Sequence, residues 1–114
     1  MNNVNAVLSS FTDLQNDIDG AINGGKTLDL NKNYIYQGGD SGKIVEIKGD
    51  LTINGNGHLI DGSNLVSIFN ISNSNVIINN VVFTRSNGDF SILVFNSNLI
   101  LNNVSFIDNG GDCD

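Results

Sequence analysis

The stretch Val76-Ile77-Ile78-Asn79-Asn80-Val81-Val82-Phe83 returns in nearly the same form as Leu99-Ile100-Leu101-Asn102-Asn103-Val104-Ser105-Phe106. Two earlier stretches, Leu28-Asp29-Leu30 and Leu51-Thr52-Ile53, have the same apolar alternation and are also followed by Asn. A third set recurs at regular spacing and contains Val45-Glu46-Ile47, Phe69-Asn70-Ile71 and Leu93-Val94-Phe95. Each repeat therefore contains three short alternating strands, separated by turns rich in Asn, Gly, Ser and Asp.

Such short strands cannot form a useful sheet within one repeat, but they can pair with the same strand of the next repeat. If each repeat makes one turn of a coil, equivalent strands lie parallel and about 4.8 Å apart. The inward side chains then form three columns: Leu30, Ile53, Ile78 and Leu101; Phe83 and Phe106; Val45, Phe69 and Leu93. Because parallel crossovers are right-handed, the sequence predicts an all-β fold, a right-handed parallel β-helix of about three to four coils.

The repeated Asn residues have a structural explanation on this coil. One column is expected to contain Asn31, Asn54, Asn79 and Asn102. In it each side-chain amide would donate a hydrogen bond to the carbonyl above. The adjacent positions Gly55, Asn80 and Asn103 would lie at a sharp bend, where the backbone needs residues that tolerate positive φ. We interpret these residues as a structural ladder.

The N-terminal segment has a different period. Phe11, Leu14, Ile18 and Ile22 recur at helical spacing. Ser10 precedes them with the spacing of a capping box, and Gly24-Gly25 ends the segment. We predict a helix near residues 10–22 that covers the open end of the first coil. The predicted organisation is an N-terminal segment with this capping helix at 1–24, followed by β-helix coils at 25–114.

The other end of the predicted coil has no such cap. Leu99, Leu101, Val104 and Phe106 would lie at an open edge, whereas solenoids need a polar terminal unit. Either a longer parent protein continues with further coils, or two copies stack end to end as a homodimer. We favour the longer parent, of which this chain would be a truncated piece. Cys113, the only Cys, could bridge two such chains.

The composition excludes several classes of partner. The chain has 12 acidic and 5 basic side chains, and its net charge is −7. Nucleic acids and anionic membrane surfaces would both repel it. No apolar run is long enough to span a membrane. The first residues lack the features of a signal peptide, so the protein is either cytosolic or a fragment without its signal.

Part of the coil sequence is similar to that of a known family. The run Leu51-Thr52-Ile53-Asn54-Gly55-Asn56-Gly57-His58-Leu59-Ile60-Asp61-Gly62 and the later run from Phe69 to Phe83 resemble opening coils of adhesin-like surface proteins of methanogenic archaea. Those proteins are right-handed β-helices of the pectate-lyase-like superfamily. The resemblance covers about residues 10–112. It implies an extracellular stalk or adhesion domain that contacts a surface glycan or protein.

The same superfamily contains polysaccharide lyases and glycoside hydrolases, so a fragment of such an enzyme is the alternative. Lyases of this kind place an acidic Ca²⁺ cluster and a basic residue on the outer face of the first strand column. Here that face would show Glu46 with Asn70 and Val94, and one carboxylate does not make a Ca²⁺ site. Arg85, the only Arg, follows a different strand.

Other polar residues are candidates for chemistry. Asp89 and Asp112 are one repeat apart, so stacking could bring their carboxyl groups to the separation that a glycosidase needs. Together with Asp114 they are also candidate Ca²⁺ ligands, although exposed turns explain them equally well. His58 lies near Asp61, but we expect it to be structural. We therefore expect no catalytic residue, no bound metal and no cofactor.

An outward apolar strip is a candidate partner surface. Ile44, Ile68 and Ile92 recur at equal spacing, beside Asn70 on the same outer face. The strip could bind a partner, neighbouring loops could cover it, or the register could be wrong by one residue so that the Ile side chains point inward. Asn70 also begins a glycosylation sequon, as does Asn103, which is expected to lie in a turn.

Three functions remain open from the sequence. The first, which the resemblance favours, is a non-catalytic cell-surface module. The second is a fragment of a polysaccharide lyase or glycoside hydrolase. The third is a self-associating scaffold that stacks through its open edge.

Overall fold

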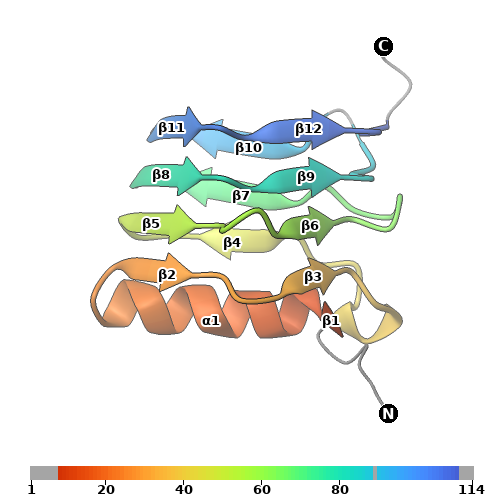
Figure 1. Cartoon of the computed structure of the whole chain (residues 1–114), viewed down its shortest axis with the longest axis horizontal. Coiled ribbons are helices and arrows are strands. Elements are labelled where there is room, and N and C mark those ends of the chain that lie inside the picture. The colour runs from red at the N-terminus through yellow and green to blue at the C-terminus, as the bar shows by residue number, and fades with distance from the viewer. Residues whose placement is uncertain (1–7, 89, 111–114) are drawn as a thin grey trace.

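A computed structural model describes residues 8–88 and 90–110 of the chain. Figure 1 shows the chain wound into stacked turns, with one helix beneath them and the last strands at the top. Successive turns rise in a right-handed sense, and the coil makes about three turns. The structure confirms the predicted right-handed parallel β-helix with its N-terminal helix.

Three parallel sheets form the walls of the coil. Sheet A contains, in spatial order, β1 (Leu8–Ser9), β3 (Asn33–Ile35), β6 (Leu59–Asp61), β9 (Val82–Thr84) and β12 (Ser105–Ile107). Sheet B contains β2 (Thr27–Asp29), β5 (Leu51–Asn54), β8 (Asn75–Asn79) and β11 (Asn98–Asn102). Sheet C contains β4 (Val45–Ile47), β7 (Phe69–Ser72) and β10 (Ile92–Phe95). A 3-10 turn, η2 (Gly38–Asp40), lies between β3 and β4.

The inward column of sheet B differs from the prediction at its N-terminal end. Ile53, Ile78 and Leu101 are in register as predicted, but Leu28 and not Leu30 pairs with Ile53. Leu30 is still buried, and its N–H donates to the carbonyl of Asn54 beyond the strand. The first repeat therefore has the same length in this sheet as the second.

Sheet C contains a second difference in register. Val45 pairs with Phe69 as predicted, but Phe69 pairs with Ile92, so Leu93 pairs with Asn70 on the outer face. The last two turns thus have the same spacing in sheet C as in sheets A and B. The predicted spacing is one residue longer and is wrong for this pair of strands.

This register removes the predicted Ile strip. Ile68 is fully buried, and Ile92 pairs with Phe69 on the inner face. Ile44 is half-buried beside the N-terminal helix. The three side chains do not form an outward column, so they do not make a partner surface. Asn70 does lie on the outer face, where its amide nitrogen is 3.4 Å from both carboxylate oxygens of Glu46.

The predicted cap is confirmed. Helix α1 (Phe11–Asn23) lies across the N-terminal end of the coil (Figure 1), and not along its side. Ser10 Oγ accepts a hydrogen bond from the N–H of Asp13, whose carboxylate accepts from the N–H of Ser10, as the capping box predicts. Phe11, Leu14 and Ile18 are buried in the same core as the inward columns of the coil.

Candidate functional site

The acidic residues proposed as Ca²⁺ ligands are not among the residues that the structure describes. Asp89, Asp112 and Asp114 lie outside the described residues, as does Cys113, so their predicted roles stay predictions. Within residues 8–88 and 90–110, no group of three or more His, Cys, Asp and Glu side chains is placed to hold a metal ion.

His58 and Asp61 have different partners. The imidazole Nδ1 of His58 lies 3.1 Å from Asn33 Oδ1. The buried carboxylate of Asp61 accepts from Arg85, at 2.9 Å from Nε and 2.6 Å from Nη2. These hydrogen bonds, and the charge of Asp61, raise the pKa of Arg85. The pair joins two successive turns, so both groups are engaged in the fold. The sequence reasoning missed it, although the separation of one repeat was a signal.

Tyr34 and Tyr36 are core residues, and both rings are buried. The hydroxyl of Tyr34 donates to Asp17 of α1 at 2.7 Å. Burial and this acceptor together raise the pKa of Tyr34. The hydroxyl therefore stays protonated and serves as a link between the cap and the first turn.

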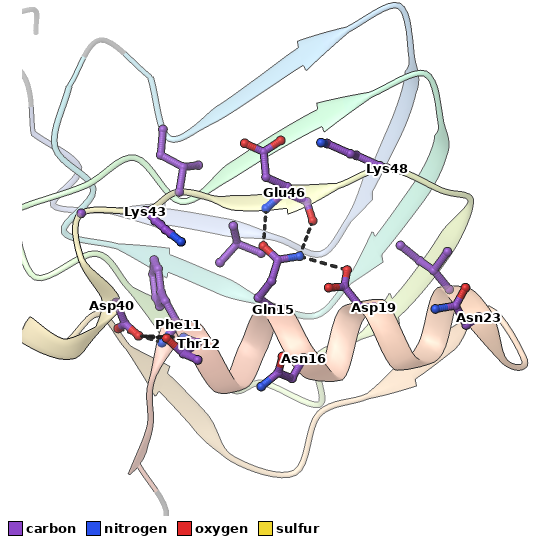
Figure 2. Close-up of a pocket in the computed structure, with 14 residues that line it drawn as sticks. Phe11, Thr12, Gln15, Asn16, Asp19, Asn23, Asp40, Lys43, Glu46 and Lys48 are labelled. Carbon is purple, nitrogen blue, oxygen red and sulfur yellow. Dashed lines mark hydrogen bonds between the residues drawn. The ribbon is translucent and has the colours of Figure 1, made fainter.

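A groove of about 860 Å³ lies between α1 and β4 (Figure 2). Gln15 crosses it and pairs with the backbone of β4. Its Oε1 accepts from the N–H of Glu46 at 2.7 Å, and its Nε2 donates to the carbonyl of Glu46 at 2.8 Å. Because β4 is the edge strand of sheet C, the carboxamide of Gln15 takes the place of a peptide group from a further strand.

Asp40 lies at one end of the same groove (Figure 2). Only 4% of its surface is exposed, and its carboxylate accepts from the N–H groups of Phe11, Thr12 and Gln37 and from Thr12 Oγ1, at 2.6–3.0 Å. Gln15 and Asp40, two polar residues that line the groove, thus hold the cap on the coil. The sequence reasoning missed both Gln15 and Asp40.

The Gln15 contact can be tested by a change of one atom. We expect Gln15→Glu to lower the free energy of unfolding by about 1–3 kcal/mol, because a carboxylate oxygen would face the carbonyl of Glu46 where an N–H now donates. Asn16→Asp makes the same amide-to-acid change at an exposed position of α1 and should have little effect. Urea denaturation followed by circular dichroism measures both; equal losses would contradict the pairing.

The Asp40 contacts predict a dependence of stability on pH. Burial alone would raise its pKa, but the hydrogen bonds from Thr12, Gln37 and Phe11 outweigh burial and hold the pKa below its usual value of 3.8. The stabilisation is therefore present above about pH 4 and is lost as the pH falls through the lowered pKa. We expect Asp40→Asn to remove this part of the acid sensitivity. Identical pH profiles of urea stability for both proteins would contradict it.

In the part of the chain that the structure describes, the opposite end of the coil is open. β10, β11 and β12 are the last strands of their sheets, and within the described residues each pairs on one side only. The hollow at this end has a volume of about 480 Å³ and is lined mainly by the apolar residues Phe90, Ile92, Leu99, Leu101 and Phe106. Phe106 is 47% exposed, whereas Phe83, directly beneath it in the column, is fully buried.

The last turn is also apolar on its outer side. Leu93 pairs with Asn70, Phe95 with Ser72 and Ile107 with Thr84. Each of these apolar residues therefore lies above a polar residue of the turn beneath. All three are exposed, as is Ile100 of β11. Apolar surface therefore continues from the open end onto all three walls of the last turn, which makes this turn the clearest candidate interaction surface of the described structure.

A ladder of side-chain amides runs up sheet B to this open end. Asn102 Nδ2 donates to Asn79 Oδ1 at 2.8 Å, and Asn79 Nδ2 donates to Asn54 Oδ1 at 3.0 Å, which confirms the predicted contacts among these three. The base differs: Asn54 Nδ2 donates to Asp29 Oδ1 at 2.9 Å, and Asn31 lies beyond the ladder position. Donation also runs toward the N-terminal turn, and not toward the turn above as predicted.

The bend next to this ladder is partly as predicted. Asn80 and Asn103 have positive φ values of 57° and 54°, and the amide of Asn103 donates to that of Asn80. Gly55 does not have positive φ, which contradicts the prediction; Asn56 has it instead. Gly55 is needed for space, because a Cβ there would overlap the side chain of Val81 and the carbonyl of Asn80.

Comparison of the chain with known proteins found no matching family model, no matching curated protein and no matching solved structure. Among the described residues, the helix is too short and too polar to cross a membrane.

Proposed function

We propose that this chain is a non-catalytic structural module of an elongated β-helix at a cell surface, where it serves as a stalk or as an adhesion domain for a surface glycan or protein. The observation that carries the proposal is the difference between the two ends of the coil. α1 seals one end with its own side chains, whereas the other end leaves three strand edges and an apolar column uncovered.

The way in which polar groups are used supports a structural role. Gln15 and Asp40 hold the cap, Arg85 is paired with Asp61 across two turns, and the Asn amides bond to their own copies. Each of these contacts connects one turn or element to the next along the coil axis. Such an arrangement resists extension along that axis, which is what a stalk requires.

The surface composition supports an exposed location. The net charge is −7 and the described coil has polar side chains on most outward positions beneath its last turn. The exposed Phe95 and Leu93 of the last turn would provide apolar contact area for an adhesion partner.

The location can be tested by labelling intact cells of the organism that encodes the chain with an antibody raised against it. The proposal predicts labelling without permeabilisation and its loss after treatment of intact cells with protease. Labelling that requires lysis would contradict a surface role. Release of unsaturated uronate from uronate polymers by the purified chain would instead favour the polysaccharide-lyase alternative.

A self-associating scaffold is the second candidate, because the same uncovered edges favour it. Sedimentation equilibrium distinguishes the two candidates. Self-association predicts a concentration-dependent dimer that Leu101→Asp disperses, since Leu101 lines the open hollow. A monomer over the same concentration range, unchanged by Leu101→Asp, favours the structural module.

A further inference from the structure

We infer that the open end of the coil is selective for direction: it accepts a further coil of the same repeat, running parallel and presenting amide N–H donors, and it disfavours a second copy of this chain. The inference rests on the proposed structural role and adds the identity of the partner. Its basis is the direction in which the amide ladders donate.

Asp29 sets the direction of the sheet B ladder. An ionised carboxylate only accepts hydrogen bonds, whereas an Asn amide can donate through nitrogen and accept through oxygen. Asn54 must therefore turn its Nδ2 toward Asp29, which leaves its Oδ1 for Asn79. The same logic orients Asn79 toward Asn54 and Asn102 toward Asn79. One acidic residue at the base thus fixes the orientation of every amide above it.

This ladder and the other amide columns end at the open edge in the same orientation. The terminal amides of all of them donate to the turn beneath: Asn96 to Asn73, Asn98 to Asn75, Asn102 to Asn79 and Asn103 to Asn80. Beneath the Asn98 column, Asp50 accepts from the backbone N–H of Asn75 at 2.8 Å, so the carboxylate that receives a ladder amide is Asp29. Each terminal amide therefore turns one of its N–H groups to the turn beneath, and within the described residues no donor is placed on its oxygen.

A second copy of this chain does not supply matching donors. Two open ends related by a two-fold axis would each turn their terminal amide oxygens toward the other copy, while the N–H groups that make the ladders face the turn beneath. Head-to-tail stacking would require the other end of the coil, but α1 covers that end and Gln15 occupies the edge of β4. Neither arrangement of copies satisfies the ladders.

A further coil of the repeat does supply them. In a parallel layer the Asn residues one repeat further on would lie above Asn98 and Asn102, as these lie above Asn75 and Asn79. The apolar column and the strand edges do not select a direction. An added strand can bury the apolar column and pair with the strand edges whether it runs parallel or antiparallel. Apolar burial therefore provides the stability of the added layer, and the ladders select its direction.

The test is a full chain in which residues 87–109 are duplicated directly after residue 109, so that one more coil follows the last turn. We expect this chain to have a higher urea midpoint and to remain a monomer. A second version carries Asn98→Asp and Asn102→Asp in the added copy only. At neutral pH these acceptor-only groups should raise the equilibrium constant for unfolding about tenfold or more, relative to the version that keeps Asn at both positions. Below about pH 4 the protonated acids can donate, and the difference should shrink.

A matched control carries Ser105→Asp in the added copy, at a solvent-facing position outside the ladders. It should lose little stability and show no such recovery in acid. If the Asn and Asp versions are equally stable at neutral pH, the inference that the amide ladders select the direction of the added coil is overturned, while the structural role stands. If no version gains stability or strand content, the structural role fails too. A tight dimer of the unmodified chain that Leu101→Asp dissociates would also overturn the inference.

Discussion

Phe83→Ala is expected to lower the free energy of unfolding by about 3–5 kcal/mol, a large part of the total for a chain of this size. Phe83 is fully buried and is the centre of an aromatic cluster. Its ring meets Phe69 edge-on at a centroid distance of 5.6 Å and stacks on Phe106 at 5.3 Å. Removing it would leave a cavity and break both contacts, because the neighbouring turns are held in register by their backbones.

Phe106→Ala is the matched control, since it removes the same side chain one turn higher in the same column. Phe106 is 47% exposed, so we expect a loss of about 1 kcal/mol. Urea denaturation followed by circular dichroism measures both variants. Equal losses would mean that the last turn is as well covered as the middle turns, and would contradict the open end.

Gly55→Ala is expected to be nearly as damaging, with a loss of about 3 kcal/mol or more, although it adds a single methyl group. Its Cβ would overlap Val81 and the backbone carbonyl of Asn80, and the carbonyl cannot move without breaking the bend of the next turn. The N–H of Gly55 also donates to the carbonyl of Asn79 at 2.7 Å, which holds the two bends together.

Gly25→Ala provides the comparison for this change. A Cβ at Gly25 would meet no atom within 4 Å, and its φ is not in the left-handed region, so we expect little change or a small gain. Thermal unfolding of the two variants gives the result directly. If Gly55→Ala unfolded at the temperature of the unmodified chain, the close approach of these two turns would be wrong.

The coil itself could be predicted because its signal is repeated. The near copy of 76–83 at 99–106 leaves one register for the last two turns of sheets A and B, and the structure has that register. The helical cap was also predictable, since apolar spacing and the Ser10–Asp13 capping box both indicate it. Local pattern and long-range pairing agree in these segments.

The wrong registers occur where the pattern is ambiguous. Leu28-Asp29-Leu30 is symmetric about its polar residue, so both Leu belong to the same face and either could pair with Ile53; only the pairing of β2 with β5 decides it. Ile92-Leu93-Val94-Phe95 is apolar at every position, which hides the alternation that would identify its inner face. Asn31 was misplaced for the first reason and Ile92 for the second.

The contacts that hold the cap on the coil could not be predicted from spacing. Gln15 meets Glu46, and Asp40 meets Thr12, across elements of different type that are far apart in the sequence. Neither separation is related to the repeat. The direction of the ladder was equally hidden, because it depends on Asp29, which the predicted register placed outside the column.

Backbone hydrogen exchange of the intact chain tests most directly the central claim, that one end of the coil is capped and the other is open. We predict slow exchange for the N–H of Glu46, which donates to Gln15 although β4 is an edge strand. In β8, which has a partner on both sides, every strand N–H should be slow. In β11 alternate N–H groups should exchange fast, because every second one faces the open edge. Fast exchange at Glu46, or uniformly slow exchange along β11, would contradict the account.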